Sequence, residues 1–147
     1  MKIRIIVAGK PALAYAKSGV EDYLRRLGKS GDCQLVSVKA GNSTEVSARL
    51  LEASHDTYRI ALDECGSLPT TRQLASRLDA LHLRGDVKSV SFLIGAADGH
   101  TQALRDACDF LLALSPLTLQ HELALLVLLE QLYRVASIRS GSPYHRD

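Results

Sequence analysis

The sequence predicts one α/β domain with a mostly parallel β-sheet flanked by helices, and three observations support this. Short apolar runs alternate with longer segments of helical periodicity, which is the pattern of βαβ units. The chain has 147 residues, of which 46% are hydrophobic and 23% are charged, values typical of a single globular domain. No internal repeat or linker divides it, so residues 1–147 are expected to form one domain.

The expected strands are short, mostly apolar runs that end at turn residues. Lys2–Ala8 ends at Gly9 and Pro11. Ser89–Ile94 is apolar enough to be buried on both faces, as a central parallel strand is. The full set of expected strands is 2–8, 34–38, 59–62, 89–94 and 110–114.

Capping signals delimit the expected helices. Asn42 with Glu45, and Thr70 with Gln73, have the spacing of a capping box. Gly85 is the expected stop of the helix that Thr70 begins. The expected helices are 13–27, a helix after Asn42 that reaches Ala53, 70–83, 101–108 and 121–138.

The last expected helix has no polar face over residues 123–129, which are all apolar. A helix that is apolar all round must be covered all round. The sheet can cover one side, and we expect a second copy of the chain to cover the other in a two-fold homodimer. The alternative is a helix sandwiched inside one chain.

The cysteines and histidines give no metal signature. Cys33, Cys65 and Cys108 are far apart and form no C-x-x-C pair, so we expect free, buried thiols and no metal site. His55 and His82 are expected to be surface or structural residues. Charges interleave with the apolar N-terminal residues, unlike a signal peptide, so a cytoplasmic location without membrane contact is expected.

The formal net charge of +2 is slight, but its distribution is uneven. From residue 131 onward, Arg134, Arg139 and Arg146 stand against Asp147 alone, so this tail holds the whole excess. A basic terminal arm fits a phosphate contact, and it is equally common as an ordinary surface feature.

Three segments should follow the carboxyl ends of the strands, where parallel α/β sheets bind ligands: residues 62–66, 95–99 and 114–121. Gly95 and Gly99 would let a flat ligand approach the backbone closely. The segments contain no G-x-G-x-x-G, P-loop or G-x-S-x-G pattern. Asp63, Glu64 and Asp98 are expected to be solvated loop charges, with Asp98 the most interesting because it lies between the glycines.

Four motifs stand at and after these loops. They are Leu-Ile-Gly-Ala-Ala-Asp-Gly at 93–99, Leu-Ser-Pro-Leu-Thr-Leu-Gln-His at 114–121, Glu-Gln-Leu-Tyr-Arg-Val at 130–135 and Pro-Tyr-His-Arg-Asp at 143–147. In these motifs, and over its whole length, the sequence resembles the ribosomal large subunit methyltransferase H family of SPOUT-class methyltransferases. Tyr-Leu-Arg-Arg at 23–26 and Leu-Asp at 62–63 also fit the family.

The resemblance implies a SPOUT (α/β-knot) fold, in which the C-terminal segment forms a trefoil knot, a rare exception to the rule against knots. It also implies that S-adenosylmethionine is the cofactor and that two chains dimerise through the last helix and the knot. The implied reaction is methylation of N3 of a pseudouridine in the intersubunit hairpin of 23S ribosomal RNA, on the assembled ribosome.

The resemblance also implies residue roles. The cofactor contacts are expected at Leu62, Gly95, Leu114, Ser115, Pro116, Leu117, Thr118 and Leu119. The pseudouridine must lose its N3 proton, and His121, or His145 from the partner's tail, is expected to accept it. Tyr144 is expected to stack on a base, with Arg134 and Arg146 on phosphates; Arg134, Tyr144, His145 and Arg146 form the expected RNA-binding set.

A second interpretation stays open, because the chain departs from the family pattern at Ala96, Gln120 and Leu125. Ala96 replaces a loop glycine, Gln120 a proline, and Leu125 a basic residue that could contact RNA. The alternative function is that of a degenerate, non-catalytic SPOUT-fold dimer that binds RNA or ribosomes. A flavodoxin-like binding domain is a weaker third interpretation, since nothing selects a flavin phosphate site.

Overall fold

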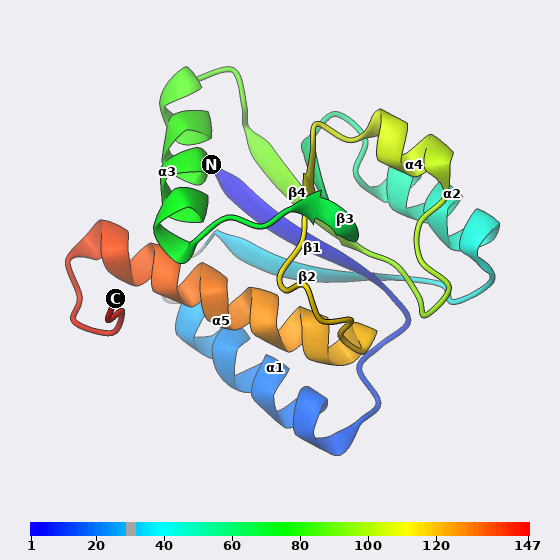
Figure 1. The fold of residues 1–147 in the computed structure, drawn as a ribbon, viewed down its shortest axis with the longest axis horizontal. Coiled ribbons are helices and arrows are strands. Elements are labelled where there is room, and N and C mark those ends of the chain that lie inside the picture. Colours follow the sequence, from blue (N-terminus) through cyan, green and yellow to red (C-terminus); the bar gives the residue numbers. More distant parts are fainter. Residues whose placement is uncertain (29–31) are drawn as a thin grey trace.

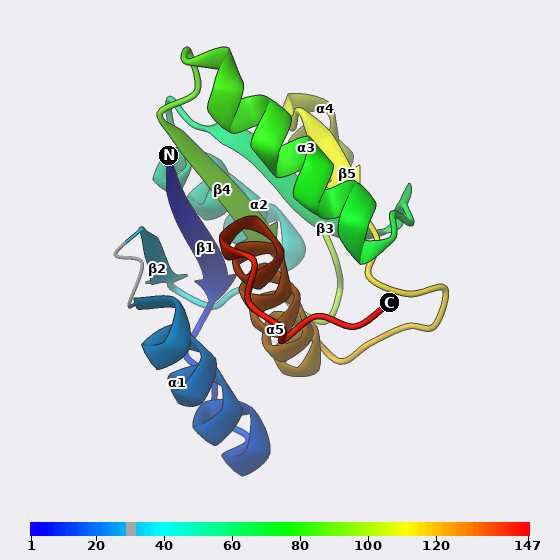
Figure 2. The same cartoon turned by 90° about the vertical axis from the view of Figure 1, so that its left-hand side faces the viewer.

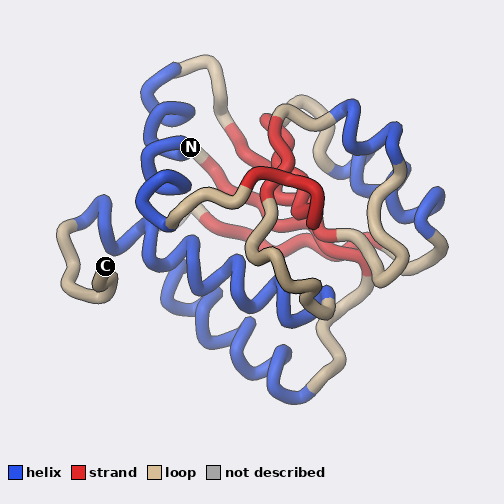
Figure 3. Tube along the Cα trace, in the orientation of Figure 1, coloured by secondary structure: helices blue, strands red, loops and turns tan. Residues whose placement is uncertain are grey.

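The structure is a computed structural model that describes residues 1–28 and 32–147. Within these residues the strands form one five-stranded parallel sheet of order β2-β1-β4-β3-β5 (Figure 3). The strands are β1 (Lys2–Ala8), β2 (Cys33–Val38), β3 (Tyr58–Ser67), β4 (Ser89–Ile94) and β5 (Phe110–Leu112). The expected α/β class and parallel sheet are therefore confirmed.

Helices cover both faces of the sheet. They are α1 (Ala14–Gly28), α2 (Ser43–Ala53), α3 (Thr71–Arg84), α4 (Gln102–Ala107) and α5 (His121–Ser140). Figures 1 and 2 show α1, α3 and α5 on one face and α2 with α4 on the other. The short loops after β3, β4 and β5 all leave the sheet at the same edge, because parallel strands share their direction.

Alternating residues of the central strands supply the two apolar cores. Ile5, Ile60 and Phe92 pack in the larger core with α1, α3 and α5. Their neighbours Ile6, Ala61 and Leu93 pack in the smaller core with α2 and α4. All six side chains are fully buried, which explains why β4 is largely apolar, with Ser89 and Ser91 as its two polar residues.

Helix ends lie close to the positions that the capping signals predict. Asn42 and Thr70 each accept from the third backbone amide of their helix, and Glu45 and Gln73 reach back to complete both capping boxes. Gly85 ends α3 in the left-handed conformation, with φ of 77°.

β3 is longer than the pattern suggests. We expected it to end at Leu62, but it continues to Ser67 through a register shift, so that both Leu62 and Ser67 face Leu112. Gly66 makes this possible, because a Cβ there would lie 2.6 Å from the Leu111 carbonyl carbon. Asp63–Gly66 is thus an irregular strand segment rather than a loop.

α5 is covered largely by its own chain. It lies between α1 and α3 on the sheet (Figure 2), and none of residues 121–138 is exposed. Gly19 of α1 lets the two helices approach, since a Cβ there would lie 2.7 Å from the Leu126 side chain. The sandwiched helix, which was the alternative to cover by a second copy, therefore accounts for much of the apolar surface, and the homodimer stays a prediction.

Of the expectations for histidines and cysteines, some are confirmed and one is wrong. His55 and His82 are exposed, as expected. The described cysteines are free, as expected, but Cys65 is exposed and Cys33 and Cys108 are only partly buried, so the expectation of buried thiols is wrong at Cys65 and holds only in part at the other two. Within residues 1–28 and 32–147, no helix has the length and apolarity needed to cross a membrane, and no cluster of His, Cys, Asp and Glu could hold a metal ion.

Candidate functional site

The three segments that were expected to bind ligand converge on one cavity of about 300 Å³. This happens because β4, β3 and β5 are neighbours in the sheet and release their loops at one edge. Of the expected cofactor contacts, those that line the cavity are Leu62, Gly95, Leu114, Ser115, Leu117, Thr118 and Leu119. Pro116 is exposed and is not part of the lining.

The loop 95–99 is fastened to the start of α2. The Ser43 amide donates to Asp98 Oδ2 at 2.9 Å, and the Ser43 hydroxyl donates to the Gly99 carbonyl at 2.8 Å. A further bond from the Gly99 amide to the Ala96 carbonyl, at 3.0 Å, closes the turn. The expected functional role of Asp98 is therefore better described as fastening this loop.

Ala96 does not distort the loop. Asp56 is the one non-glycine residue with positive φ in the described part of the chain, so Ala96 adopts an ordinary backbone conformation. Gly99, with φ of 79°, is the position in this loop that requires glycine.

Asp63 is not a solvated loop charge, which corrects the sequence expectation. Its side chain is 3% exposed and Oδ2 lies 2.6 Å from Arg105 Nε of α4. Oδ1 accepts from the Cys65 amide at 2.9 Å. Burial alone would raise the pKa of this carboxyl, but the bonds from Arg105 and Cys65, with the nearby positive charge, lower it. The ion pair fixes the wall of the cavity between β3 and α4.

His100 lies in the same wall, directly after the loop. The residue is 7% exposed, and neither ring nitrogen makes a hydrogen bond of good geometry in the described structure, although the ring lies near the Leu62 and Leu93 backbone. Burial lowers the pKa of the imidazole, although the Asp63 carboxylate opposes this. A buried, neutral histidine without a well-formed hydrogen bond thus lines the cavity.

The outer rim joins two of the three segments. Thr118 donates to Glu64 Oε2 at 3.4 Å, and Ser115 Oγ accepts from the Leu117 amide at 2.9 Å. Leu117 is 75% exposed, so an apolar side chain stands at the mouth of the cavity. Glu64 is exposed, as expected.

His121 lines the cavity from the first residue of α5. Its Nδ1 lies 3.3 Å from the Gln120 amide nitrogen, and Nε2 has no partner in the described residues. Gln120 also caps α5, accepting from the Glu122 and Leu123 amides at 2.9 and 3.0 Å. A glutamine can therefore replace the family's proline here without loss of the helix start.

The C-terminal tail lies against the other end of α5. Tyr144 stacks edge-on against Tyr133, with ring centroids 4.6 Å apart, and its hydroxyl lies 3.0 Å from that of Tyr23. Burial, the bond to Tyr23 and the Glu130 carboxylate together raise the pKa of Tyr144 to about 12.

The charged tail residues are paired within the chain. His145 Nδ1 lies 3.3 Å from Arg134, and its Nε2 lies 3.0 Å from Asp147. Asp147 in turn forms a two-bond ion pair with Arg72 of α3, at 2.8 and 2.9 Å. Arg134 also pairs with Glu130, and Arg139 with Asp79. Arg146 is exposed and makes no ion pair with the described residues.

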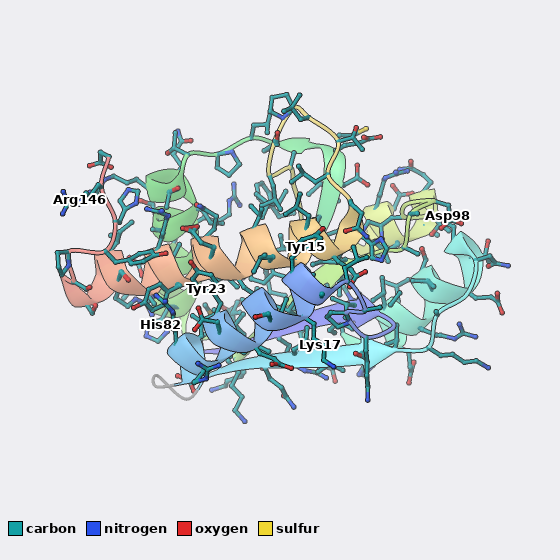
Figure 4. The ribbon with its side chains drawn as sticks, turned by 90° about the horizontal axis from the view of Figure 1, so that it is seen from below. Tyr15, Lys17, Tyr23, His82, Asp98 and Arg146 are labelled. Atoms are coloured by element: carbon teal, nitrogen blue, oxygen red, sulfur yellow. The ribbon has the colours of Figure 1, made fainter. Side chains whose placement is uncertain are left out.

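One chain does not bring all the expected site residues together. His121 and the cofactor contacts lie at the start of α5, whereas Arg134, Tyr144, His145 and Arg146 lie at its far end. About 20 Å of helix separates His121 from Arg134. Figure 4 shows Asp98 of the pocket loop and Arg146 at opposite ends of the molecule.

Leu125 cannot contact RNA in this fold. This α5 residue is 2% exposed, and its side chain belongs to the larger core between the helix and the sheet. A basic side chain at this position would need a different environment, so the departure at Leu125 is a change in packing.

Sequence reasoning missed two features of the pocket, the Asp63–Arg105 pair and His100. A polar side chain that immediately follows a glycine turn after a buried strand was a usable signal for His100. The Asp63–Arg105 contact joins residues 42 positions apart and had no local signal.

Comparison with known proteins agrees with this architecture. A family profile described as "Predicted SPOUT methyltransferase" matches residues 1–145. The chain is 48% identical over 146 residues to a protein of Thermus thermophilus named ribosomal RNA large subunit methyltransferase H, covering 99% of each chain. It is 41% identical to a protein of the same name from Deinococcus radiodurans, again covering 99% of each.

Solved structures share the fold at low sequence identity. A probable methyltransferase from Bordetella pertussis superposes with a TM-score of 0.58 at 14% identity, covering 91% of this chain and 95% of that one. A tRNA (m1G37) methyltransferase from Aquifex aeolicus has a TM-score of 0.58 at 12% identity, covering 92% and 70%. At these identities the likeness concerns the fold alone.

Proposed function

This chain belongs to the ribosomal RNA large subunit methyltransferase H family of SPOUT methyltransferases, and we propose that it methylates large-subunit ribosomal RNA with S-adenosylmethionine as donor. More finely, we propose N3 of a pseudouridine in the intersubunit hairpin of 23S RNA as the acceptor, on assembled ribosomes in the cytoplasm. The convergence of residues 62–66, 95–99 and 114–121 on one cavity is the observation that carries the proposal.

The lining of the cavity fits the donor. Leu62, Leu114 and Leu119 offer apolar walls for a flat adenine ring, and Gly95 gives close access to the backbone. Asp63, Glu64 and Asp98 outnumber Arg105 among the charged lining residues, which favours a ligand that carries positive charge. S-adenosylmethionine has both an adenine and a sulfonium.

When bound, the donor supplies an electrophilic methyl group and leaves as a neutral thioether. The acceptor nitrogen forms the new C–N bond while the C–S bond breaks, and its proton must pass to a base. The protein contributes by holding the two reactants in line, which can supply several kcal/mol of the rate enhancement.

Between the two candidate bases, the geometry of one chain favours His121. It lines the cavity and keeps Nε2 unpaired, so a proton could reach it directly or through one water. Both ring nitrogens of His145 are engaged, with Arg134 and Asp147. His145 would have to leave these partners before it could act on RNA.

We propose that the complete site uses two chains. A pocket at one end of α5 and a tail at the other can meet if a second copy packs antiparallel along this helix, which a two-fold axis produces. Tyr144 would then stack on a base and Arg134 and Arg146 would contact phosphates beside the partner's pocket. The trefoil knot, the dimer and these residue roles belong to the same proposal.

The test has two steps. Calorimetric titration with S-adenosylmethionine should give one site per chain, and intact ribosomes should then accept a labelled methyl group that maps to a pseudouridine. Absence of donor binding would refute the proposal. His121→Ala should slow methylation by about 10²–10⁴-fold at saturating donor; wild-type rates in both His121→Ala and His145→Ala would reject both bases.

The two sequence departures that suggested a non-catalytic function do not support it in this fold. Ala96 has an ordinary backbone conformation and Leu125 is a core residue. Neither substitution closes the cavity or removes a surface charge. The labelled-methyl assay separates the two functions, because a degenerate dimer would bind ribosomes and transfer nothing.

A further inference from the structure

His100 carries an unmet hydrogen-bonding need. The residue is 7% exposed, and neither ring nitrogen is accessible to water or makes a hydrogen bond of good geometry within the described structure, although the ring lies near the Leu62 and Leu93 backbone. Buried polar groups in proteins are nearly always paired, because an unpaired one keeps its desolvation penalty. A fold that keeps such a group inside a ligand cavity has a ligand as its natural partner.

The His100 ring lies close against the pocket loop, because Gly95 has no side chain to keep it away. A Cβ at that position would lie 3.1 Å from both Nδ1 and Cε1 of the ring. Gly95 and His100 both line the cavity, so the edge of the imidazole lies behind one glycine residue. The loop that covers it is fastened at its far end only, by Ser43 to Asp98 and Gly99.

The charge state of the ring limits its partner. Burial lowers the pKa of His100, so the ring is neutral near pH 7 and offers one donor and one acceptor. The Asp63 carboxylate beside it disfavours a carboxylate ligand. A hydroxyl group both donates and accepts.

We infer that His100 is a binding residue of the methyl-donor pocket, and that it pairs with a ribose hydroxyl of the donor when loop 95–99 shifts around the bound nucleoside. This rests on the proposed function, because it assumes a nucleoside ligand in the cavity. His100 holds the ligand in place and has no part in proton transfer.

His100→Leu tests the inference, since leucine is apolar and of similar size. Removing both unpaired nitrogens should raise the melting temperature of the free protein. The same change should weaken the binding of S-adenosylhomocysteine by about tenfold, as measured by calorimetry, which is the loss expected for one hydrogen bond. If His100 had a purely structural role, the variant would have a lower melting temperature and an unchanged ligand affinity. A higher melting temperature together with a lower ligand affinity therefore identifies a binding role.

Two ligands locate the contact. 5′-Methylthioadenosine has the nucleoside without the amino-acid part. Its affinity should fall by the same factor in His100→Leu as that of S-adenosylhomocysteine. A loss of affinity for S-adenosylhomocysteine alone would place the contact on the amino-acid part of the ligand and overturn the inference. His100→Asn keeps a donor and an acceptor and should retain most of the affinity, which guards against misfolding of the leucine variant.

His82→Leu is the matched control, because His82 is exposed on α3, away from the cavity (Figure 4). It should change neither affinity. If the wild-type protein binds both ligands and His100→Leu binds them equally well, the inference fails and the proposed function stands. If the wild-type protein binds neither ligand, the proposed function fails and the inference fails with it.

Discussion

The two ends of α5 differ in how their polar groups are satisfied. At the tail end, His145, Asp147 and Arg72 form a continuous chain of bonds, and Tyr144 bonds to Tyr23. At the pocket end, His100 has no hydrogen bond of good geometry and His121 keeps one nitrogen unpaired within the described residues. Apart from Arg146, the polar groups of the tail are paired within one chain, whereas those of the pocket are not.

This difference separates a region built for stability from one built for a ligand. Unpaired buried groups cost stability and persist where function needs them. Paired surface groups at the tail contribute little individually and can be exchanged for RNA or a second chain at low cost. We therefore expect pocket substitutions to change stability and ligand affinity, and tail substitutions to change RNA methylation.

The largest effect is expected at Asp63. Asp63→Ala removes one partner of a largely buried ion pair and frees the Cys65 amide, so the free energy of unfolding should fall by about 3 kcal/mol in chemical denaturation. Asp86→Ala is the control, because Asp86 pairs with Arg84 in solvent. Equal stability of the two variants would contradict the buried pair.

The same residue should give the fold an acid dependence. Because the folded protein lowers the pKa of Asp63, its stabilisation is present above the unfolded value near 4 and is lost as pH falls below it. Urea midpoints of the wild type should drop over that range, and those of Asp63→Asn should drop less. If the urea midpoints of the two proteins fell in parallel with pH, other carboxylates would account for the acid dependence.

The next effect concerns the tail. Removal of residues 142–147 should lower ribosome methylation by about 100-fold, roughly 2.7 kcal/mol, with donor affinity unchanged. Mixing this chain with a full-length Ser115→Trp chain, whose indole fills the pocket, should restore about a quarter of the activity through mixed dimers with one intact site. No recovery on mixing would contradict a site shared between chains.

A smaller effect is expected at Gly95. In Gly95→Ala the new methyl would lie 3.1 Å from the His100 ring, so the ring or the loop must shift. Donor affinity in calorimetry should fall about tenfold, the cost of a modest clash. Gly28→Ala is the control, since a Cβ there meets nothing within 4 Å.

The smallest effect is expected at Tyr23. Tyr23→Phe removes the 3.0 Å contact with the Tyr144 hydroxyl and should cost about 0.5–1 kcal/mol of unfolding free energy. Spectroscopic titration should show the pKa of Tyr144 moving from about 12 toward its ordinary value. Tyr15→Phe, on an exposed residue, should change neither quantity.

The tyrosine shift also predicts alkaline behaviour. A folded pKa above the unfolded one contributes stability that is present below about pH 10 and is lost as pH rises toward 12. Alkaline unfolding of Tyr23→Phe should therefore depend less on pH over this interval than that of the wild type.

Local patterns predicted most of the fold. The capping boxes at Asn42 and Thr70 and the short apolar runs of β1 and β4 involve near neighbours in the chain, so the sequence displays them directly. The extension of β3 past Leu62 escaped prediction, because a register shift depends on the backbone of β5 beside Gly66.

The candidate site was predicted in outline. Strand-end geometry and the family motifs pointed to residues that line the cavity, apart from Pro116. The role expected for Asp63 was wrong, since a carboxylate in a short polar run is typical of a solvated loop. Its burial depends on Arg105, which α4 brings from 42 residues away.

By itself, the sequence determined the order of strands and helices, the parallel sheet and the edge where a ligand would bind. These follow from periodicity and from chain direction. The tertiary structure decided which groups lack partners, which are paired, and that the pocket and tail lie at opposite ends of α5. Such facts depend on contacts between distant residues, which no local pattern contains.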